Sequence, residues 1–132
     1  MNLVLASHGN FAKELVKSAE MIYGDMSDVP IVSLMPGMSF EGFTKEASEV
    51  LDKTGKNTLV LVDLFGGTPS NVFSALTRKY GHHVVTGLNL PMLIEVYSTM
   101  KGDASLSVEQ VVKLALDTLQ SSGVYVNERL GR

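Results

Sequence analysis

Short, mostly apolar runs alternate along the whole chain with segments whose apolar residues recur at helical spacing. The runs are rich in valine and leucine and are bounded by glycine, proline and polar residues, which is typical of strands. In the segments between them, apolar residues return every three or four positions, as on the buried face of an amphipathic helix. We therefore expect strands at 3–6, 29–34, 58–64 and 82–86, and helices at 12–23, 40–51, 69–80, 91–100 and 108–119.

Polar residues and prolines at the starts of the helical segments support this assignment. Ser39 is placed to cap the second helix, and Thr68 followed by Pro69 is placed to cap and begin the third. Ser107 and Gln110 have the spacing of a capping box before the last helix. Capping chemistry and periodicity therefore predict the same helix starts.

The repeated order of strand and helix predicts an α/β fold. The apolar run at 58–64 is typical of a strand buried on both faces and favours a parallel sheet with helices on both faces. We expect the flavodoxin-like strand order 2-1-3-4, in which ligands bind beyond the carboxyl ends of strands 1 and 3. Residues 124–126 are a candidate further strand, and residues 1–132 are expected to form one domain.

The composition of the chain excludes several classes of partner and of reactive site. The formal net charge is −3 and no basic stripe is visible, so nucleic acid is not an expected partner. The absence of cysteine rules out a disulfide framework, a thiolate metal site and a cysteine nucleophile. No apolar stretch approaches the roughly 20 residues of a membrane span, and residues 3–6 do not resemble a secretory signal, so we expect a cytoplasmic protein.

His8 directly follows the first predicted strand and precedes a glycine. A histidine in this position is expected to face the crevice at the carboxyl edge of the sheet. A neutral imidazole nitrogen is a good nucleophile toward phosphorus and also a metal ligand. The alternative is a histidine that only hydrogen-bonds a loop.

Asp63 is a lone carboxylate near the end of the third, otherwise apolar strand. Burying a carboxylate is costly unless it is paired. If strands 1 and 3 are neighbours, Asp63 can accept a hydrogen bond from one ring nitrogen of His8 and so fix which nitrogen is free. The alternative is an aspartate that braces a loop or caps a helix.

Gly66, Gly67 and Thr68 lie between the third strand and the third helix. Glycines let the backbone approach a ligand closely, and the free N–H groups of a helix start attract anions. These residues are candidates to bind a phosphoryl group held on His8. A tight turn that simply needs glycine is the alternative, because the loop is neither a P-loop nor a dinucleotide-binding motif.

Two other groups of residues stand near the ends of the predicted strands. His82 and His83 begin the fourth strand, far from the crevice, and are expected to be structural or solvated. Flexible methionines and other apolar residues in the crevice loops are suited to transient protein docking, although each taken singly is more typical of core. The candidate docking residues are Met35, Pro36, Phe65, Pro91 and Met92.

Three segments together resemble the mannose-family IIA domains of the phosphoenolpyruvate-dependent sugar phosphotransferase system. The most specific is Leu61-Val62-Asp63-Leu64-Phe65-Gly66-Gly67-Thr68-Pro69-Ser70-Asn71. The others are Ser7-His8-Gly9 and Gly87-Leu88-Asn89-Leu90-Pro91-Met92-Leu93. Their order and spacing extend the resemblance over nearly the whole chain.

This resemblance implies a phosphocarrier without a cofactor or a metal. His8 would accept a phosphoryl group from phosphorylated HPr and pass it to a IIB component that serves a membrane permease. Asp63 matches the aspartate that orients the histidine, and Thr68 stands where the family has Ser or Thr beside the phosphoryl group. The resemblance also implies a homodimer that exchanges its C-terminal strand, here 124–126. We expect IIB to be a separate chain and this chain to associate peripherally with the membrane through the permease complex.

Two other classes of function remain open at this point. Metal chelatases of tetrapyrroles also place a His-Gly pair after the first strand, but they need a further ligating residue in the crevice. The second alternative is a binding module that regulates a partner without transferring phosphate. The sequence is not expected to reveal which sugar is transported, because a IIA domain never contacts the sugar.

Overall fold

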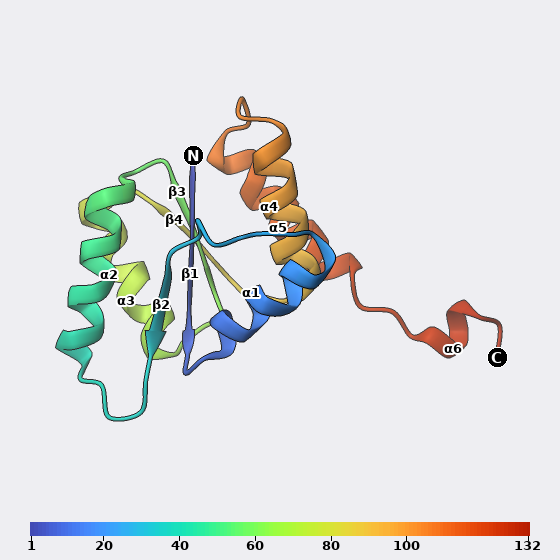
Figure 1. Ribbon diagram of the computed structural model, residues 1–132, viewed down its shortest axis with the longest axis horizontal. Coiled ribbons are helices and arrows are strands. Elements are labelled where there is room, and N and C mark those ends of the chain that lie inside the picture. Colours follow the sequence, from blue (N-terminus) through green and yellow to red (C-terminus); the bar gives the residue numbers. More distant parts are fainter.

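The computed structural model describes residues 1–132 as a sheet with helices packed on both of its faces (Figure 1). The strands are β1 (Asn2–His8), β2 (Ile31–Leu34), β3 (Thr58–Val62) and β4 (His83–Thr86). The helices are α1 (Phe11–Ile22), α2 (Phe40–Thr54), α3 (Thr68–Tyr80), α4 (Leu90–Gly102), α5 (Val108–Ser121) and α6 (Val126–Arg129). Strand and helix alternate from β1 to α4, as the apolar pattern predicts.

The four strands run parallel in the order β2-β1-β3-β4, which confirms the flavodoxin-like expectation. β1 and β3 are neighbours at the centre of the sheet, with Leu3 opposite Leu59 and Ala6 opposite Val62. Because β2 and β3 lie on opposite sides of β1, the chain order reverses beside β1. The carboxyl ends of β1 and β3 are therefore the switch point at which such sheets bind ligands.

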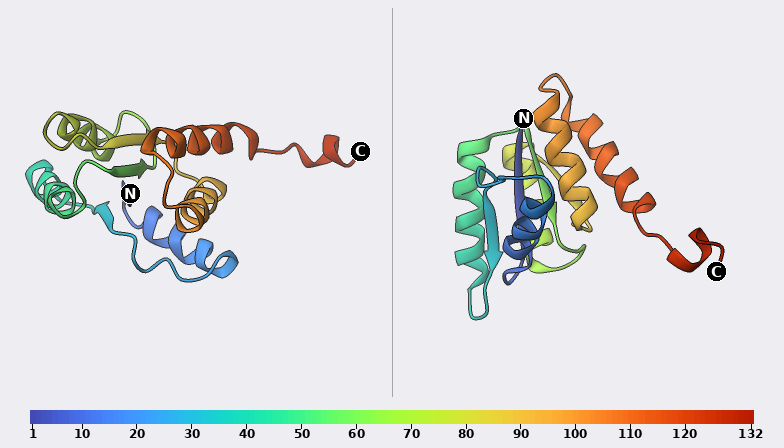
Figure 2. Two further views of the ribbon diagram at one scale, coloured as in Figure 1. Left: turned by 90° about the horizontal axis from the view of Figure 1, so that it is seen from above. Right: turned by 45° about the vertical axis from the view of Figure 1, so that its right-hand side comes forward.

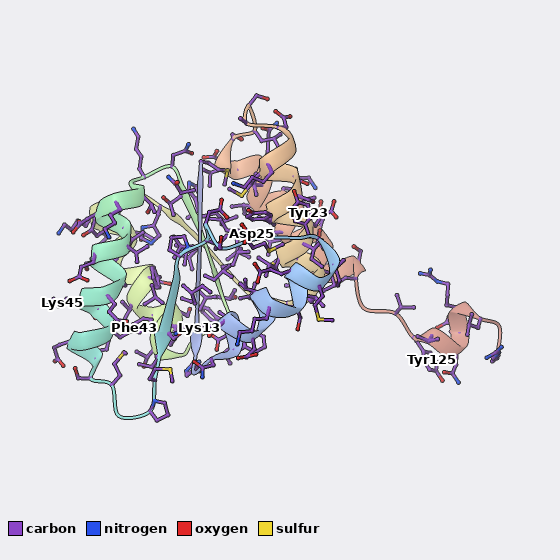
Figure 3. All side chains as sticks on the ribbon, in the orientation of Figure 1. Lys13, Tyr23, Asp25, Phe43, Lys45 and Tyr125 are labelled. Atoms are coloured by element: carbon purple, nitrogen blue, oxygen red, sulfur yellow. The ribbon has the colours of Figure 1, made fainter.

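Alternate residues of the central strands are buried in two separate cores. Leu3 and Leu5 pack with α1, α4 and α5, whereas Val4 and Ala6 pack with α2 and α3. Figures 1 and 2 show these two helical layers on either side of the sheet. Phe43, which points from α2 toward the sheet in Figure 3, is fully buried. Burial of one such side chain stabilises the fold by roughly 1.5–3 kcal/mol.

The caps of α2 and α5 are as expected, and that of α3 is not. Ser39 accepts a hydrogen bond from Gly42 N at 2.9 Å, and Ser107 and Gln110 form a capping box. Thr68, predicted to cap α3, is instead its first helical residue, and Gly67 occupies the cap position without a side-chain bond. The helix start is thus left with free N–H groups.

The C-terminal segment differs from the sequence expectation. Residues 124–126 form no strand: the chain is irregular up to Tyr125, and the short helix α6 begins at Val126. A strand needs a neighbouring strand for its hydrogen bonds, and this segment leads away from the sheet (Figures 1 and 3). Val124, Tyr125, Val126 and Leu130 are between 47% and 71% exposed.

None of the helices combines the length with the apolar character that crossing a bilayer requires.

Candidate functional site

His8 and Asp63 come together because the strands that carry them are paired. His8 is the last residue of β1, and Asp63 follows the last residue of β3. The Asp63 N–H donates to Ala6 O at 3.2 Å, which continues the sheet pairing by one step beyond β3. Both side chains therefore lie at the carboxyl edge of the sheet, at the switch point.

The carboxylate of Asp63 holds His8 by two hydrogen bonds. Oδ2 accepts from the backbone N–H of His8 at 2.9 Å and lies 2.8 Å from the ring Nδ1. Oδ1 accepts from Leu64 N at 2.9 Å. Because an ionised carboxylate only accepts hydrogen bonds, Nδ1 carries the ring proton and the lone pair of Nε2 is free. The His8 side chain is 47% exposed, against 14% for Asp63, so a second molecule can reach the ring.

The loop that follows His8 is held in place by its own hydrogen bonds. The hydroxyl of Ser7 is buried and accepts from Ala12 N at 2.9 Å, which satisfies one of the free N–H groups at the start of α1. Gly9 N donates to Leu34 O at 2.8 Å, and Gly9 has a φ of +55° that disfavours other residues. Sequence reasoning missed the role of Ser7, although a serine directly before the histidine was visible.

Gly67 is in direct contact with the imidazole ring. A Cβ atom at this position would lie 2.5 Å from Cε1 and 3.0 Å from Nε2 of His8. The neighbouring Gly66 has a φ of +94°, and its carbonyl accepts from the Asn71 side chain at 3.4 Å. The glycine pair thus brings the backbone against the free nitrogen, which a side chain at Gly67 would prevent.

The first turn of α3 begins at this contact. The N–H groups of Gly67, Thr68 and Ser70 form no hydrogen bond, and Pro69 has no N–H. Free N–H groups and the helix dipole attract an anion at a helix start. A negatively charged group attached to Nε2 would lie at the beginning of this helix.

The candidate docking residues are exposed around the site, with one exception. Phe65 is 83% and Met35 is 37% exposed, and Pro36 and Pro91 are also exposed. Met92 belongs to α4, and its side chain is fully buried in the core between this helix and the sheet. It therefore cannot contribute to a docking surface. A hollow of about 390 Å³ lies beside His8 and is lined by His8, Gly9, Leu34, Met35, Pro36, Gly37 and Met38.

Three further apolar side chains are exposed at this edge; the sequence places Leu64 in a crevice loop, whereas Phe11 and Phe40 were not expected there. Phe11 is 46%, Phe40 is 58% and Leu64 is 51% exposed. Phe11 and Phe40 are the first residues of α1 and α2, so both lie at the carboxyl edge of the sheet. The position of Phe11, three residues after His8, is the feature of the sequence that could have placed it beside the site.

The other two histidines lie away from the site. His82 is buried, and its Nε2 donates to Phe73 O at 2.9 Å. Burial lowers the pKa of His82 below its usual 6.5, so the ring is held neutral. His83 begins β4, at the edge of the sheet opposite His8. The expected structural role of His82 fits these contacts.

A second polar cluster braces the amino-terminal edge of the sheet. Asp28 accepts from the Tyr97 hydroxyl at 2.7 Å and from the Lys101 ammonium. These contacts, that of Lys101 foremost, hold the pKa of Asp28 below its usual range. The cluster ties the loop before β2 to α4 and takes no part in the site at His8.

Comparison with known proteins gives the same class of protein as the fold and the site. A family model described as "PTS system fructose IIA component" matches residues 2–116. The chain is 35% identical over 119 residues to the "PTS system mannose-specific EIIAB component" of Escherichia coli (strain K12), a match that covers 88% of this chain and 36% of that protein. It is 29% identical over 133 residues to the "PTS system sorbose-specific EIIA component" of Lacticaseibacillus casei, covering 98% and 94%.

A solved structure agrees with these matches. The mannose/sorbose-specific IIA subunit of the phosphotransferase system from Enterococcus faecalis superposes with a TM-score of 0.81 at 33% identity, covering 93% of this chain and 92% of that one. The fold and site define a doubly wound α/β protein with a histidine–aspartate pair at its switch point. The chain belongs to the mannose-family IIA components of the sugar phosphotransferase system. It spans about a third, 36%, of the length of the Escherichia coli relatives that it matches.

Proposed function

We propose that this chain is a phosphocarrier that accepts a phosphoryl group from phosphorylated HPr on His8 and passes it to a IIB component. The observation that carries the proposal is the pairing of His8 Nδ1 with Asp63 at 2.8 Å, which leaves Nε2 free beside the start of α3. Family membership supports the same role. The relatives are described as mannose, sorbose and fructose components, and the sugar served by this chain is left open.

In the accepting step, the lone pair of His8 Nε2 attacks phosphorus and forms a new P–N bond. The P–N bond to the donor histidine breaks, and its electron pair stays on the donor ring nitrogen. The His8 ring gains positive charge as the bond forms, while Nδ1 keeps its proton. Asp63 stabilises this charge through the Nδ1–H hydrogen bond and keeps the nucleophilic tautomer in place.

The start of α3 is suited to hold the transferred group. The unpaired N–H groups of Thr68 and Ser70 are available to phosphoryl oxygens on Nε2, and the Thr68 hydroxyl is a further candidate donor. Gly66 and Gly67 allow the close approach. Transfer between two histidines depends on positioning and charge stabilisation, so we propose no metal or cofactor for this step.

Both partners would dock on the same exposed apolar surface. Met35, Pro36, Phe65 and Pro91 are exposed around His8, as a surface used in turn by two proteins requires. Because each partner must bring its own phosphoryl-carrying group to Nε2, the two cannot bind at once. Contact with the membrane permease is proposed to be indirect, through IIB, from the cytoplasmic side.

A homodimer is also proposed, with the C-terminal segment exchanged between two chains. Support comes from the apolar Val124, Tyr125 and Val126, which are exposed in the single chain. The free edge of β4 offers a strand with which such a segment can pair. Exchange of one identical element gives a closed two-fold assembly.

Labelling from phosphoenolpyruvate tests the phosphocarrier role. With Enzyme I, HPr and labelled phosphoenolpyruvate, the chain should acquire an acid-labile, base-stable adduct. His8→Ala should abolish the label, whereas His83→Ala, a matched change at a histidine outside the site, should keep it. Label that persists on a folded His8→Ala protein would show that another residue carries the phosphoryl group.

A further inference from the structure

Ser7, the residue before His8, is the only polar residue buried within β1. Side chains of a strand alternate between its two faces, so Ser7 lies on the same side as Leu5, which packs against α1. Burying a hydroxyl is costly unless it is hydrogen-bonded. The partners of this hydroxyl therefore indicate its role.

The Ser7 hydroxyl joins the end of β1 to the start of α1. It accepts from Ala12 N at 2.9 Å and donates to Gly9 O at 3.4 Å. Asn10, at the cap position of α1, forms no side-chain bond to the helix. Ser7 thus provides, from the preceding strand, the bond that a capping side chain normally gives to a free N–H of the first helical turn.

His8 lies inside the turn that this hydroxyl closes. Its backbone N–H donates to Asp63 at 2.9 Å, and its ring Nδ1 lies 2.8 Å from the same carboxylate. On the other side the ring is close to Gly67, where a Cβ would lie 2.5 Å from Cε1. Apart from its bond to Asp63, the ring is placed by the backbone of the turn. A movement of the turn therefore shifts Nε2 relative to both neighbours.

Loss of the hydroxyl would move this turn. Ala12 is fully buried, so water cannot replace the hydroxyl as the acceptor for its N–H. A buried N–H without an acceptor is strongly disfavoured, so the start of α1 and the turn would shift until another acceptor is found. Displacement of a reacting group by about 1 Å can reduce a rate roughly 10²-fold. The position of His8 Nε2 thus depends on a hydroxyl that forms no bond with the ring.

We propose that Ser7 is a positioning residue for phosphoryl transfer at His8. Its hydroxyl fixes the turn so that Nε2 faces the start of α3 and stays aligned with the phosphorus of the partner. This inference rests on the proposed function, because it concerns the same reaction. The contacts by which Ser7 acts are tested separately, on the unphosphorylated protein.

Three variants separate positioning from stability. Ser7→Ala removes the hydroxyl, and Ser7→Thr keeps it and serves as the rescue variant. Thr58→Val is the matched control. The Thr58 hydroxyl is also buried and donates to Gly55 O at 2.7 Å, but it lies at the start of β3, at the edge of the sheet opposite His8. Thermal melts show whether each variant folds, and Thr58→Val shows what the loss of one buried hydroxyl does to stability alone.

NMR spectra of the unphosphorylated protein report on the contacts of Ser7. In the wild type, the Ala12 amide should be protected from exchange, and ¹⁵N shifts should place the ring proton of His8 on Nδ1. In Ser7→Ala, protection of Ala12 should fall about tenfold or more, and the ring should populate both tautomers because it moves relative to Asp63. Thr58→Val should show neither change. An unchanged Ala12 amide and His8 ring in Ser7→Ala would overturn the proposal.

Rapid-quench transfer from phosphorylated HPr tests the positioning itself. In Ser7→Ala the rate constant at saturating donor should fall about 10- to 10²-fold. The donor concentration that gives half of the maximal rate should stay unchanged, because the exposed docking residues are untouched. Ser7→Thr should recover most of the rate, and Thr58→Val should transfer at the wild-type rate.

The kinetic outcomes that contradict the proposal are distinct from a failure of the proposed function. Wild-type transfer by Ser7→Ala, an equal loss in Ser7→Ala and Thr58→Val, or no recovery in a folded Ser7→Thr protein would each overturn the positioning role. Absence of label on wild-type His8 would contradict the proposed function and with it any role of Ser7 in transfer, whereas the contacts of Ser7 are judged by the NMR result alone.

Discussion

Replacement of Asp63 by asparagine tests how much of the reactivity of His8 depends on its partner. The change keeps the size of the side chain but replaces one acceptor oxygen with an NH₂ donor. In the native site three N–H groups donate to the carboxylate: two from His8 to Oδ2 and one from Leu64 to Oδ1. An amide cannot accept all three bonds in this arrangement.

Each orientation of the amide has a definite consequence. If its oxygen faces His8, the Nδ1–H bond survives without the negative charge, and the NH₂ group opposes Leu64 N–H. If its NH₂ group faces His8, it favours the tautomer in which Nε2 carries the proton, and the nucleophile is lost. Hydrogen bonds to a charged group contribute about 1.5–3 kcal/mol, which corresponds to roughly 10- to 10²-fold in rate. The equivalent change in the serine-protease triad costs about 10⁴-fold, and we expect roughly 10- to 10³-fold here because no proton leaves the nucleophile.

The assay is rapid-quench transfer from phosphorylated HPr, with a thermal melt of the same sample. The rate should fall while the fold is retained, because the change keeps the size of a side chain that lies at the edge of the sheet, outside both hydrophobic cores. Asp63→Glu is the companion variant, since it keeps the charge and moves the carboxylate. Wild-type transfer by a normally folded Asp63→Asn protein would refute the reasoning and reduce Asp63 to a residue that braces the loop.

Three further predictions follow from other parts of the structure. Gly67→Ala should slow transfer about tenfold or more, because a Cβ at Gly67 would lie 2.5 Å from His8 Cε1 and must displace the ring. Gly102→Ala, where a Cβ would meet no atom within 4 Å, should leave the rate unchanged, and an unchanged rate for Gly67→Ala by rapid quench would contradict this. The free energy of unfolding should fall as the pH drops below 6.5 toward the lowered pKa of His82, because the unfolded state then binds the proton more readily. Urea unfolding should show a smaller fall for His82→Gln, and an identical pH dependence would count against burial of a neutral ring. Truncation after Ser122 should convert a dimer into a monomer or an aggregate, and a dimer of unchanged mass by light scattering would exclude exchange of the C-terminal segment.

The sequence was sufficient to predict the sheet order and the histidine–aspartate pair. Strands that are apolar on both faces and alternate with amphipathic helices leave few topologies open, and this order places the ends of β1 and β3 side by side. Asp63 stood out because a lone carboxylate next to an apolar strand needs a partner. His8 was the only histidine at the same edge of the sheet.

Features that depend on side-chain orientation could not be predicted. Met92 fits the apolar spacing of α4 together with Leu93 and Val96, which indicates burial, and its side chain is fully buried. Its choice as a docking residue rested only on its place beside the loop after β4, which does not fix where the side chain points. Phe40 fits the buried stripe of α2 by spacing, yet it is 58% exposed because it begins the helix at the edge of the sheet. Thr68 is a good capping residue, but the chain turns one residue earlier, at Gly67.

The strand propensity of a segment also failed to predict its structure where tertiary contacts determine that structure. Val124, Tyr125 and Val126 have strong strand propensity, but a strand forms only against a neighbour, and in the single chain this segment lies against no strand. The contact of Gly67 with the His8 ring is likewise a consequence of two loops meeting. Neither loop contains this information by itself.

The most direct test of the account is the position of phosphorus on the labelled protein. With ¹⁵N-labelled histidine, NMR of the phosphorylated chain distinguishes the two ring nitrogens of His8. We expect phosphorus bonded to Nε2 and a proton retained on Nδ1, hydrogen-bonded to Asp63. Phosphorus on Nδ1, or on a residue other than His8, would contradict it.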